Sequence, residues 1–191
     1  MQIEKYLWER IANDDQHAYA EVFGMLYKRL YNYGRKFSSN ESLIEDVIQE
    51  TLLSVWTKRS SLSSIEYPVT YFFTSFRNSF FTRLKSNQKI VSEEQISEEP
   101  EFGIDQIIVG RETDLETKTQ IEKALNQLTS RQKEAIFLRF YEGMSYEQVA
   151  AMLGITVKAT YKIMARALEQ LREVLHFSPC LLFFLLAGTN S

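Results

Sequence analysis

Residues 129–172 carry start and stop signals for three helices joined by tight turns, and this pattern limits the possible fold more than any other feature of the chain. A Ser or Thr followed three residues later by Gln allows two reciprocal hydrogen bonds at a helix start, the capping box. Glycine fits where a helix ends and the chain reverses. These signals stand at Thr129 with Gln132, Ser145 with Gln148, Thr156, Gly143 and Gly154. The segment is therefore predicted to form a packed helix that leads into a helix-turn-helix.

The last helix of this segment has the side chains of a helix that enters a DNA groove. Lys158, Lys162 and Arg166 recur at every fourth residue, which places them on one helix face, and no acidic residue occurs from residue 148 to residue 168. Such cations neutralise phosphates, while short side chains near the helix start allow close base contact. Those short side chains are Thr156, Ala159 and Thr160. An ordinary helical hairpin with a solvated basic face is the alternative, but the agreement of caps, turns and charge favours duplex DNA as a partner.

The composition favours an all-α protein without a cofactor. Only seven glycines and three prolines interrupt 191 residues, and no long stretch alternates apolar with polar side chains. Cys180 is the single cysteine, and His17 and His176 are the only histidines, so neither a disulfide framework nor a metal site is predicted. The first ten residues lack an apolar core of signal-peptide length, which favours a cytoplasmic location.

Charge divides the chain into two domains and a linker. Residues 91–120 carry nine acidic and two basic groups, a net charge of −7, whereas residues 1–90 and 121–191 each carry +2. A segment this polar, with like charges that repel one another, is predicted to be a flexible acidic linker. It is either a plain tether or an anionic strand that occupies a nucleic-acid channel of a partner. We expect two small helical domains at 5–88 and 121–176, the linker at 89–120 and an apolar tail at 177–191.

The first domain contains a helix, residues 42–56, with two different faces. Its apolar residues form one predicted buried stripe: Ile44, Val47, Ile48, Leu52, Val55 and Trp56. Asp46, Gln49, Glu50 and Leu53 fall on another face, where two carboxylates, an amide and an exposed leucine could dock a basic partner helix. The alternative for this face is an ordinary solvated surface.

An aromatic and basic segment follows a loop at residues 60–68. No acidic residue occurs between Tyr67 and Ser92, and aromatic residues are frequent up to Phe81. We expect Phe72, Phe76 and Phe80 to be core residues, and the remaining aromatics to stack unpaired bases while cations follow the backbone. The candidates for such contacts are Tyr67, Tyr71, Arg77, Asn78, Arg83 and Lys85.

Taken together, these segments resemble a bacterial family. Residues 45–56 are similar to the region 2.2 helix of sigma factors, residues 71–85 to regions 2.3 and 2.4, and residues 122–175 to region 4. This layout resembles the extracytoplasmic-function (ECF) type of the sigma-70 family of RNA polymerase sigma factors. Two residues depart from the family pattern: Thr82 stands where an acid is frequent, and Thr160-Tyr161 replaces a more usual Val-Lys pair.

The resemblance implies partners for each surface. The face with Asp46, Gln49, Glu50 and Leu53 would bind the clamp helices of core RNA polymerase. Tyr71, Arg77 and Asn78 would read the minus-ten element, with a flipped base held by the loop from Ser60 to Tyr67. The helix from Lys158 through Tyr161 to Arg166 would lie in the major groove of the minus-35 element. An anti-sigma factor is a further candidate partner.

We therefore interpret the chain as a sigma factor that binds core RNA polymerase, recognises promoter DNA and assists its melting for transcription initiation, with no catalytic site of its own. Two alternatives remain: a duplex-binding regulator whose first domain senses or dimerises, and a DNA recombinase, for which Tyr161 and Arg166 alone are weak support. The apolar run at 180–187 is too short to span a bilayer, so no stable membrane insertion is expected.

Overall fold

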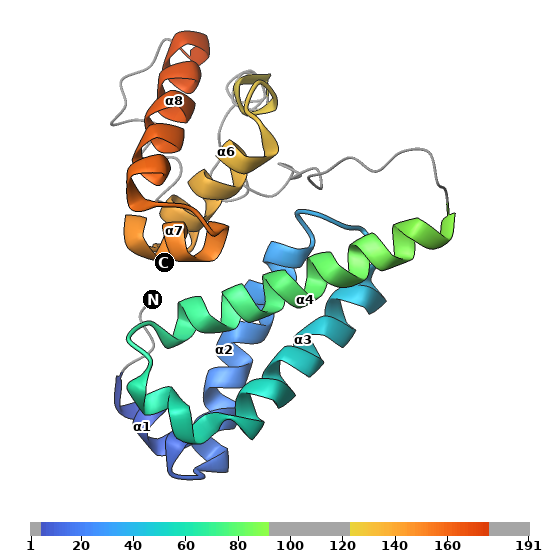
Figure 1. Cartoon of the computed structure of the whole chain (residues 1–191), viewed down its shortest axis with the longest axis vertical. Coiled ribbons are helices and arrows are strands. Elements are labelled where there is room, and N and C mark those ends of the chain that lie inside the picture. Colours follow the sequence, from blue (N-terminus) through green and yellow to red (C-terminus); the bar gives the residue numbers. More distant parts are fainter. Residues whose placement is uncertain (1–4, 92–122, 176–191) are drawn as a thin grey trace, which may run out of the picture. The chain divides into compact units, whose positions relative to one another are not determined.

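The computed structural model describes residues 5–91 and 123–175 of the chain, and the described part is built of helices and their connections, without a β-strand. The prediction of an all-α fold is confirmed. The helices belong to two compact units, one made of the helices in residues 5–91 and the other of those in residues 123–175 (Figure 1). Each unit is described by itself. The predicted linker and tail, apart from residues 89–91, lie outside the described residues.

The first unit contains α1 (Lys5–Ala12), α2 (Gln16–Gly34), α3 (Glu41–Thr57), a 3₁₀ helix (Arg59–Ser64) and α4 (Pro68–Val91). Side chains fix where two of these helices begin. Asp15 accepts hydrogen bonds from the backbone N–H groups of residues 17 and 18 at the start of α2, and Asn40 accepts one from residue 43 at the start of α3. These caps satisfy amide groups that have no partner inside a helix.

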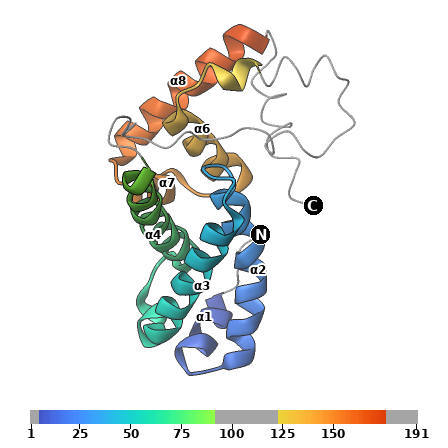
Figure 2. The same ribbon diagram turned by 90° about the vertical axis from the view of Figure 1, so that its right-hand side faces the viewer.

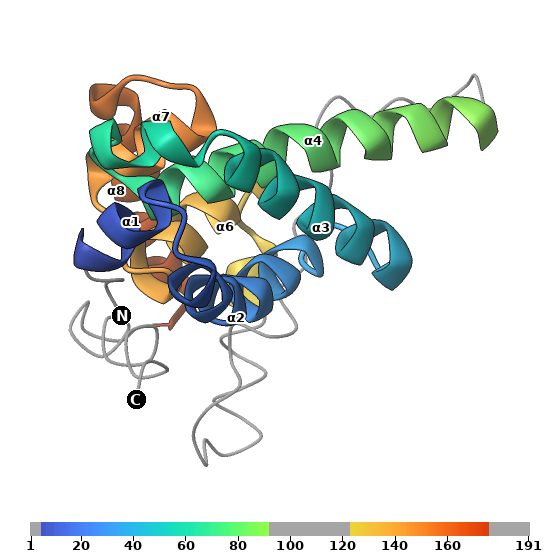
Figure 3. The same ribbon diagram turned by 90° about the horizontal axis from the view of Figure 1, so that it is seen from below.

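The core of the first unit lies where α4 packs against α2 and α3, as the view in Figure 3 makes visible. Its centre is aromatic: the fully buried rings of Phe72, Phe76 and Phe80 were predicted as core residues, and the structure confirms them. Phe73 is equally buried and contacts Tyr33 at 5.7 Å between ring centroids. Core packing therefore takes more of the aromatic side chains of α4 than the sequence pattern indicated.

Gly34 allows the end of α2 to approach α3 and α4 closely. A Cβ atom at this position would lie 2.9 Å from Cγ2 of Ile44 and 3.1 Å from Cζ of Phe76. Both contacts are closer than normal van der Waals separation, and both neighbours are fully buried. Glycine at this position is therefore a packing requirement.

The spacing of apolar residues in α2 predicts one apolar side that carries Ala18, Phe23, Leu26, Tyr27, Leu30 and Tyr31. Ala18, Leu26 and Leu30 are buried, but Phe23, Tyr27 and Tyr31 are only half-buried. Together with Tyr19 these rings form a ladder along the helix, with centroids 6.0–6.4 Å apart. Val22 and Tyr33 take the fully buried positions instead, because the core meets α2 on a face rotated from the aromatic one.

The loop predicted at residues 60–68 also differs in detail. Residues 59–64 form a 3₁₀ helix, which packs against α1, and Pro68 opens α4. Proline suits a helix start because its missing N–H would have no intrahelical partner there. α4 then runs to Val91, past the predicted domain end at residue 88.

The second unit contains α6 (Ser130–Ile136), which continues as a π-helical turn (Phe137–Tyr141), then α7 (Tyr146–Leu153) and α8 (Val157–Leu175), seen from another side in Figure 2. Both predicted capping boxes are present, at Thr129 with Gln132 and at Ser145 with Gln148. Gly154 ends α7 in the left-handed conformation, with φ of 64°. α7 and α8 pack on each other across this turn, so the predicted helix-turn-helix is confirmed.

Candidate functional site

The outward face of α3 is polar apart from one leucine. Asp46, Gln49 and Glu50 are exposed, and Leu53 has 65% of its surface accessible. On the opposite side of the same helix, Ile44, Val47, Ile48, Leu52 and Val55 are at most 1% exposed. Trp56, predicted in this stripe, is only half-buried and packs against Tyr19 in a tilted arrangement, with 4.6 Å between ring centroids. The two faces of α3 are thus separated as predicted, and its exposed leucine is available for contact.

One acidic residue of this face has an ion partner within the unit. Glu50 pairs with Arg83 of α4, and both side chains remain partly exposed. Sequence reasoning placed Glu50 at a protein contact and Arg83 at a DNA contact, and it did not connect them. The two residues are 33 positions apart, so only the packing of α3 against α4 brings them together. The α3 face and the cations of α4 are therefore neighbours.

The acidic side chains of α3 also meet the aromatic ladder of α2. The hydroxyl of Tyr27 donates to Glu45 at 3.3 Å. Burial and the charge of Glu45 raise the pKa of Tyr27, and burial and the charge of Glu41 raise that of Tyr31. Both changes favour neutral phenols beside the carboxylates. The ladder therefore fixes the acidic edge of α3 through hydrogen bonds as well as through packing.

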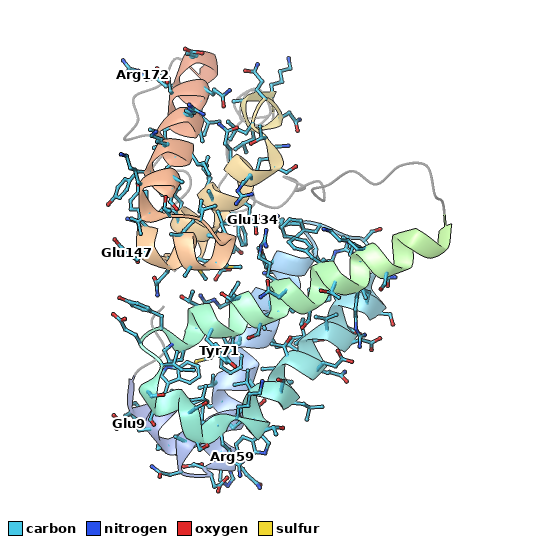
Figure 4. All side chains as sticks on the ribbon, viewed as in Figure 1. Glu9, Arg59, Tyr71, Glu134, Glu147 and Arg172 are labelled. Atoms are coloured by element: carbon cyan, nitrogen blue, oxygen red, sulfur yellow. The ribbon has the colours of Figure 1, made fainter. Side chains whose placement is uncertain are left out.

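The candidate DNA-contacting residues of α4 and of the loop before it fall into two groups by exposure. Tyr67, Asn78 and Lys85 are exposed, with Tyr67 at 42%. Tyr71, Arg77 and Arg83 are partly buried, and Figure 4 labels Tyr71 in the first half of α4.

Core packing reduces the number of aromatic rings left for base stacking on this helix. Arg77 stacks its guanidinium over the ring of Phe81 at 4.5 Å, which occupies Phe81. Because Phe73 is in the core as well, Tyr67 and Tyr71 are the candidate stacking residues on this segment. Thr82, the residue that departs from the family pattern, donates its hydroxyl to the carbonyl of Asn78 at 2.8 Å.

α8 presents a basic outer face. Lys158, Lys162 and Arg166 are exposed, as predicted. Thr156 is also exposed, and its hydroxyl oxygen accepts a hydrogen bond from the N–H of Ala159 at 3.1 Å, which caps the helix. The structure therefore holds these cations on a helix whose start is fixed.

The structure buries one of the residues of α8 that were predicted to contact bases. Thr160 is fully buried, and its hydroxyl donates to the backbone carbonyl of Thr156 at 3.2 Å. It lies on the buried face of α8 together with Met164, Ala167 and Leu171. Ala159 is partly buried. The spacing of the basic residues predicted the outer face correctly. The small size of Thr160 did not indicate that this residue lies on the buried face.

Tyr161, the residue after Thr160, is on the exposed side of α8 instead. It is 52% exposed, and its ring stacks on that of Tyr146 at 4.2 Å between centroids. Arg139 lies over the other aromatic ring of the pair, 5.2 Å from the centroid of Tyr146. Sequence reasoning missed Tyr146 and Arg139, because no spacing within one helix links residues from three different elements.

Glu147 is the acidic residue in the first turn of α7, and Arg172 lies in the last turn of α8; Figure 4 labels both. Backbone and Ser145 hydrogen bonds, followed by the charge of Arg139, lower the pKa of Glu147.

Within the described ranges, 5–91 and 123–175, no group of His, Cys, Asp and Glu side chains could hold a metal ion. None of the described helices is long and apolar enough to cross a membrane.

Two family models match the chain in the order in which its units occur. The model of sigma-70 region 2 matches residues 22–90, and that of sigma-70 region 4 matches residues 118–171. The chain is also 26% identical, over 90% of its length and 93% of the relative's, to the ECF RNA polymerase sigma factor SigK of Mycobacterium tuberculosis. The chain belongs to the ECF group of the sigma-70 family.

Further comparisons agree with this membership. This sigma factor is 25% identical to the RNA polymerase sigma factor NccH of Alcaligenes xylosoxydans, over 92% of its own length and 96% of the relative's. Its structure is similar to that of the sigma factor RpoE of Bartonella quintana, solved in complex with the anti-sigma factor NepR, with a TM-score of 0.60, 27% identity and coverage of 83% and 97% of the two chains.

A second solved structure supports the fold alone. CnrH, solved in complex with the cytosolic domain of CnrY, matches with a TM-score of 0.56 and 20% identity, over 90% of this chain and 96% of CnrH.

The predicted family and function are confirmed: this sigma factor is a transcription initiation factor that recognises promoters.

Proposed function

We propose that three surfaces of the chain, on α3, α4 and α8, have separate roles in transcription initiation. The face of α3 docks on core RNA polymerase, α4 contacts the minus-ten element, and α8 enters the major groove of the minus-35 element. The observation that carries this proposal is the outer face of α8, where Lys158, Lys162 and Arg166 are all exposed and no acidic residue precedes Glu169. Such a face can neutralise phosphates, because no carboxylate on the same face competes for its cations.

For polymerase docking, the proposed residues are Asp46, Gln49, Glu50 and Leu53. A leucine with 65% exposure at the end of a charged face is a suitable contact, because apolar burial supplies affinity while the neighbouring carboxylates orient a basic partner. The ion pair of Glu50 with Arg83 supports a basic partner in particular, because Glu50 already accepts a guanidinium in the free chain. A helix with arginine or lysine at the matching positions would make the same contact.

For the minus-ten element, the proposed residues of α4 and the preceding loop are Tyr67, Tyr71, Arg77, Asn78, Arg83 and Lys85. The tyrosines can stack unpaired bases, and the amide of exposed Asn78 can donate to and accept from a base edge. Capture of unpaired bases stabilises the open DNA, which is how a protein without a motor can assist melting.

For the minus-35 element, the proposed residues are Thr156, Lys158, Ala159, Tyr161, Lys162 and Arg166. Thr160 is left out because it is buried. The exposed cations would contact phosphates along the groove, and residues near the start of α8 would reach base edges, as in other helix-turn-helix proteins.

We further infer that the chain has no catalytic activity of its own and acts in the cytoplasm, because RNA synthesis belongs to the polymerase that it directs. An anti-sigma factor is proposed as a second protein partner. Support comes from the Bartonella quintana relative, which was solved bound to one.

Reconstitution with core RNA polymerase tests the proposal. The purified chain is mixed with core enzyme and fragmented genomic DNA, and transcript 5′ ends are mapped by sequencing. We expect start sites that share two sequence elements, near minus 35 and minus ten. Core enzyme alone is the control, and start sites that are the same with and without the chain would contradict the proposal.

A further inference from the structure

The Tyr146–Tyr161 stack lies on the helix-turn-helix and joins its two helices. Tyr146 is the first residue of α7, and Tyr161 lies near the start of α8. Their ring planes differ by only 16°, with 4.2 Å between centroids, so one face of each ring is covered by the other. Tyr161 nevertheless remains 52% exposed. The exposed part is therefore the edge of its ring, its hydroxyl and the uncovered face.

The stack is anchored at its inner end. Arg139 lies 5.2 Å from the centroid of the Tyr146 ring, and its Nη1 donates to the carbonyl of Met144 at 2.9 Å. The capping box of Ser145 fixes the helix start that carries Tyr146. A side chain held in this way has little rotamer freedom left to lose, so a contact made by Tyr161 carries a small entropic cost.

The neighbours of Tyr161 determine what it can touch. Thr160 is fully buried, Ala159 is partly buried, and Lys158 and Lys162 are exposed. With the two lysines at phosphates, the ring of Tyr161 is the bulky apolar group that α8 offers to base edges near its start. In the major groove, thymine is distinguished by its C5 methyl group, which favours apolar contact.

We propose that Tyr161 is a specificity-determining residue that reads a thymine of the minus-35 element through contact between its ring and the thymine methyl group. Tyr146 acts as its positioning residue, because the stack fixes the direction of the ring. This inference rests on the proposed placement of α8 at the minus-35 element. It goes beyond that placement by assigning the base and the contacting group, and by giving a role to Tyr146, which need not touch DNA.

The first experiment measures base preference with the complete holoenzyme. Full-length wild-type and variant chains are assembled with core polymerase and bound to a promoter library with a randomised minus-35 element, and the bound DNA is sequenced. Tyr161→Phe and Tyr146→Phe keep the stack, and we expect them to keep the wild-type preference. Tyr161→Ala and Tyr146→Ala should both lose the preference at one base pair and retain it at the others.

A matched control separates reading of the base from damage to the fold. Tyr141 stacks on Phe137 in the same unit, with 4.7 Å between centroids and 19° between planes. Tyr141→Ala removes a comparable stacked ring while leaving Tyr146 and Tyr161 in place. It should lower thermal stability as much as Tyr146→Ala does without changing the preferred base. A control that changes the same base pair would overturn the assignment to Tyr161.

The second experiment removes the proposed contact from the DNA. Deoxyuridine replaces each thymine of the selected minus-35 element in turn, which deletes one methyl group and changes nothing else in the groove. We expect wild-type holoenzyme to bind about fourfold more weakly at one position, the effect of one buried methyl group. Tyr161→Ala holoenzyme should show no loss at that position. Equal binding by wild-type holoenzyme at every position would overturn the proposal.

The outcomes distinguish this inference from the proposed function. A wild-type holoenzyme without any minus-35 preference would contradict the placement of α8, and the inference with it. A clear preference that survives Tyr161→Ala would leave the placement intact and reject the role of Tyr161. A preference lost in Tyr161→Ala but kept in Tyr146→Ala would reject the positioning role of Tyr146.

Discussion

Reversal of charge at Glu50 should weaken binding to core polymerase far more than it weakens the fold. In the free chain the side chain of Glu50 is 54% exposed and pairs with that of Arg83, which is 38% exposed. An exposed pair of this kind contributes about 0–1 kcal/mol to stability. For a domain of this size, Glu50→Lys should therefore lower the melting temperature by no more than about 4–8 °C.

At the interface the same substitution has a larger effect. It replaces an attraction by a like-charge contact with the basic partner, at a cost of several kcal/mol in a well-packed interface. With roughly 1.4 kcal/mol for each tenfold change, we expect the dissociation constant for core polymerase to rise by about 100- to 1,000-fold. Asp46→Lys should act similarly. Glu21→Lys makes the same charge change at an exposed position of α2 and is the control.

A double substitution identifies what Glu50 does. Glu50→Lys with Arg83→Glu restores an ion pair within the chain but leaves the reversed charge on the α3 face. Binding of labelled chains to core polymerase, measured by fluorescence anisotropy, should therefore remain weak in the double variant. If the double variant regains wild-type affinity, Glu50 acts by holding Arg83 and not by docking. Wild-type affinity in both Glu50→Lys and Asp46→Lys would remove the docking face altogether.

Three further predictions concern strand opening, phosphate contact and alkaline stability. Asn78→Ala or Tyr71→Ala should reduce promoter melting by about 1–3 kcal/mol through loss of a base contact, seen as weaker permanganate reactivity of unpaired thymines, and wild-type reactivity in both would refute it. Lys158→Ala and Lys162→Ala should each lower the salt dependence of DNA binding by about one counterion without changing the preferred sequence; an altered preference would reverse the assignment. Partial burial raises the pKa of Tyr19 to about 12, above its ordinary value of 10, so its stabilising contribution is complete below pH 10 and is lost as pH rises through 12. The Tyr19 hydroxyl donates to the carbonyl of Leu52 at 2.6 Å. Tyr19→Phe removes this hydrogen bond, so it should lower stability at neutral pH by about 1 kcal/mol and reduce the loss between pH 10 and 12; unchanged alkaline unfolding would contradict the contribution of the hydroxyl.

Local chemistry explains why the second unit was predictable in detail. A capping box joins residues three positions apart, so Ser145 with Gln148 can be read directly from the sequence, and the structure contains its hydrogen bonds. Gly154 was placed at the turn because the left-handed backbone there favours glycine, and its φ is 64°. The spacing of Lys158 and Lys162 likewise fixed the exposed side of α8. These features depend on neighbours within one helix or one turn.

Features that depend on how helices pack could not be read in the same way. The sequence shows that α4 is rich in aromatic residues, but only its packing against α2 and α3 decides that Phe73 is fully buried while Tyr71 is partly exposed. The same holds for Glu50 and Arg83, whose pairing requires α3 and α4 to lie side by side. A rotation of either helix by one residue would separate them.

The sequence by itself determined that the chain is helical, where several helices begin, which faces of α3 and α8 are polar, and which family the chain resembles. Each of these depends on periodicity or on hydrogen bonds between residues close in the chain. The tertiary structure decided that Thr160 is buried, that Tyr161 projects in its place and that Tyr146 supports it. Side chains that stand one position apart on a helix differ by about 100° in direction, so only the packed position of α8 determines which of the two can reach DNA.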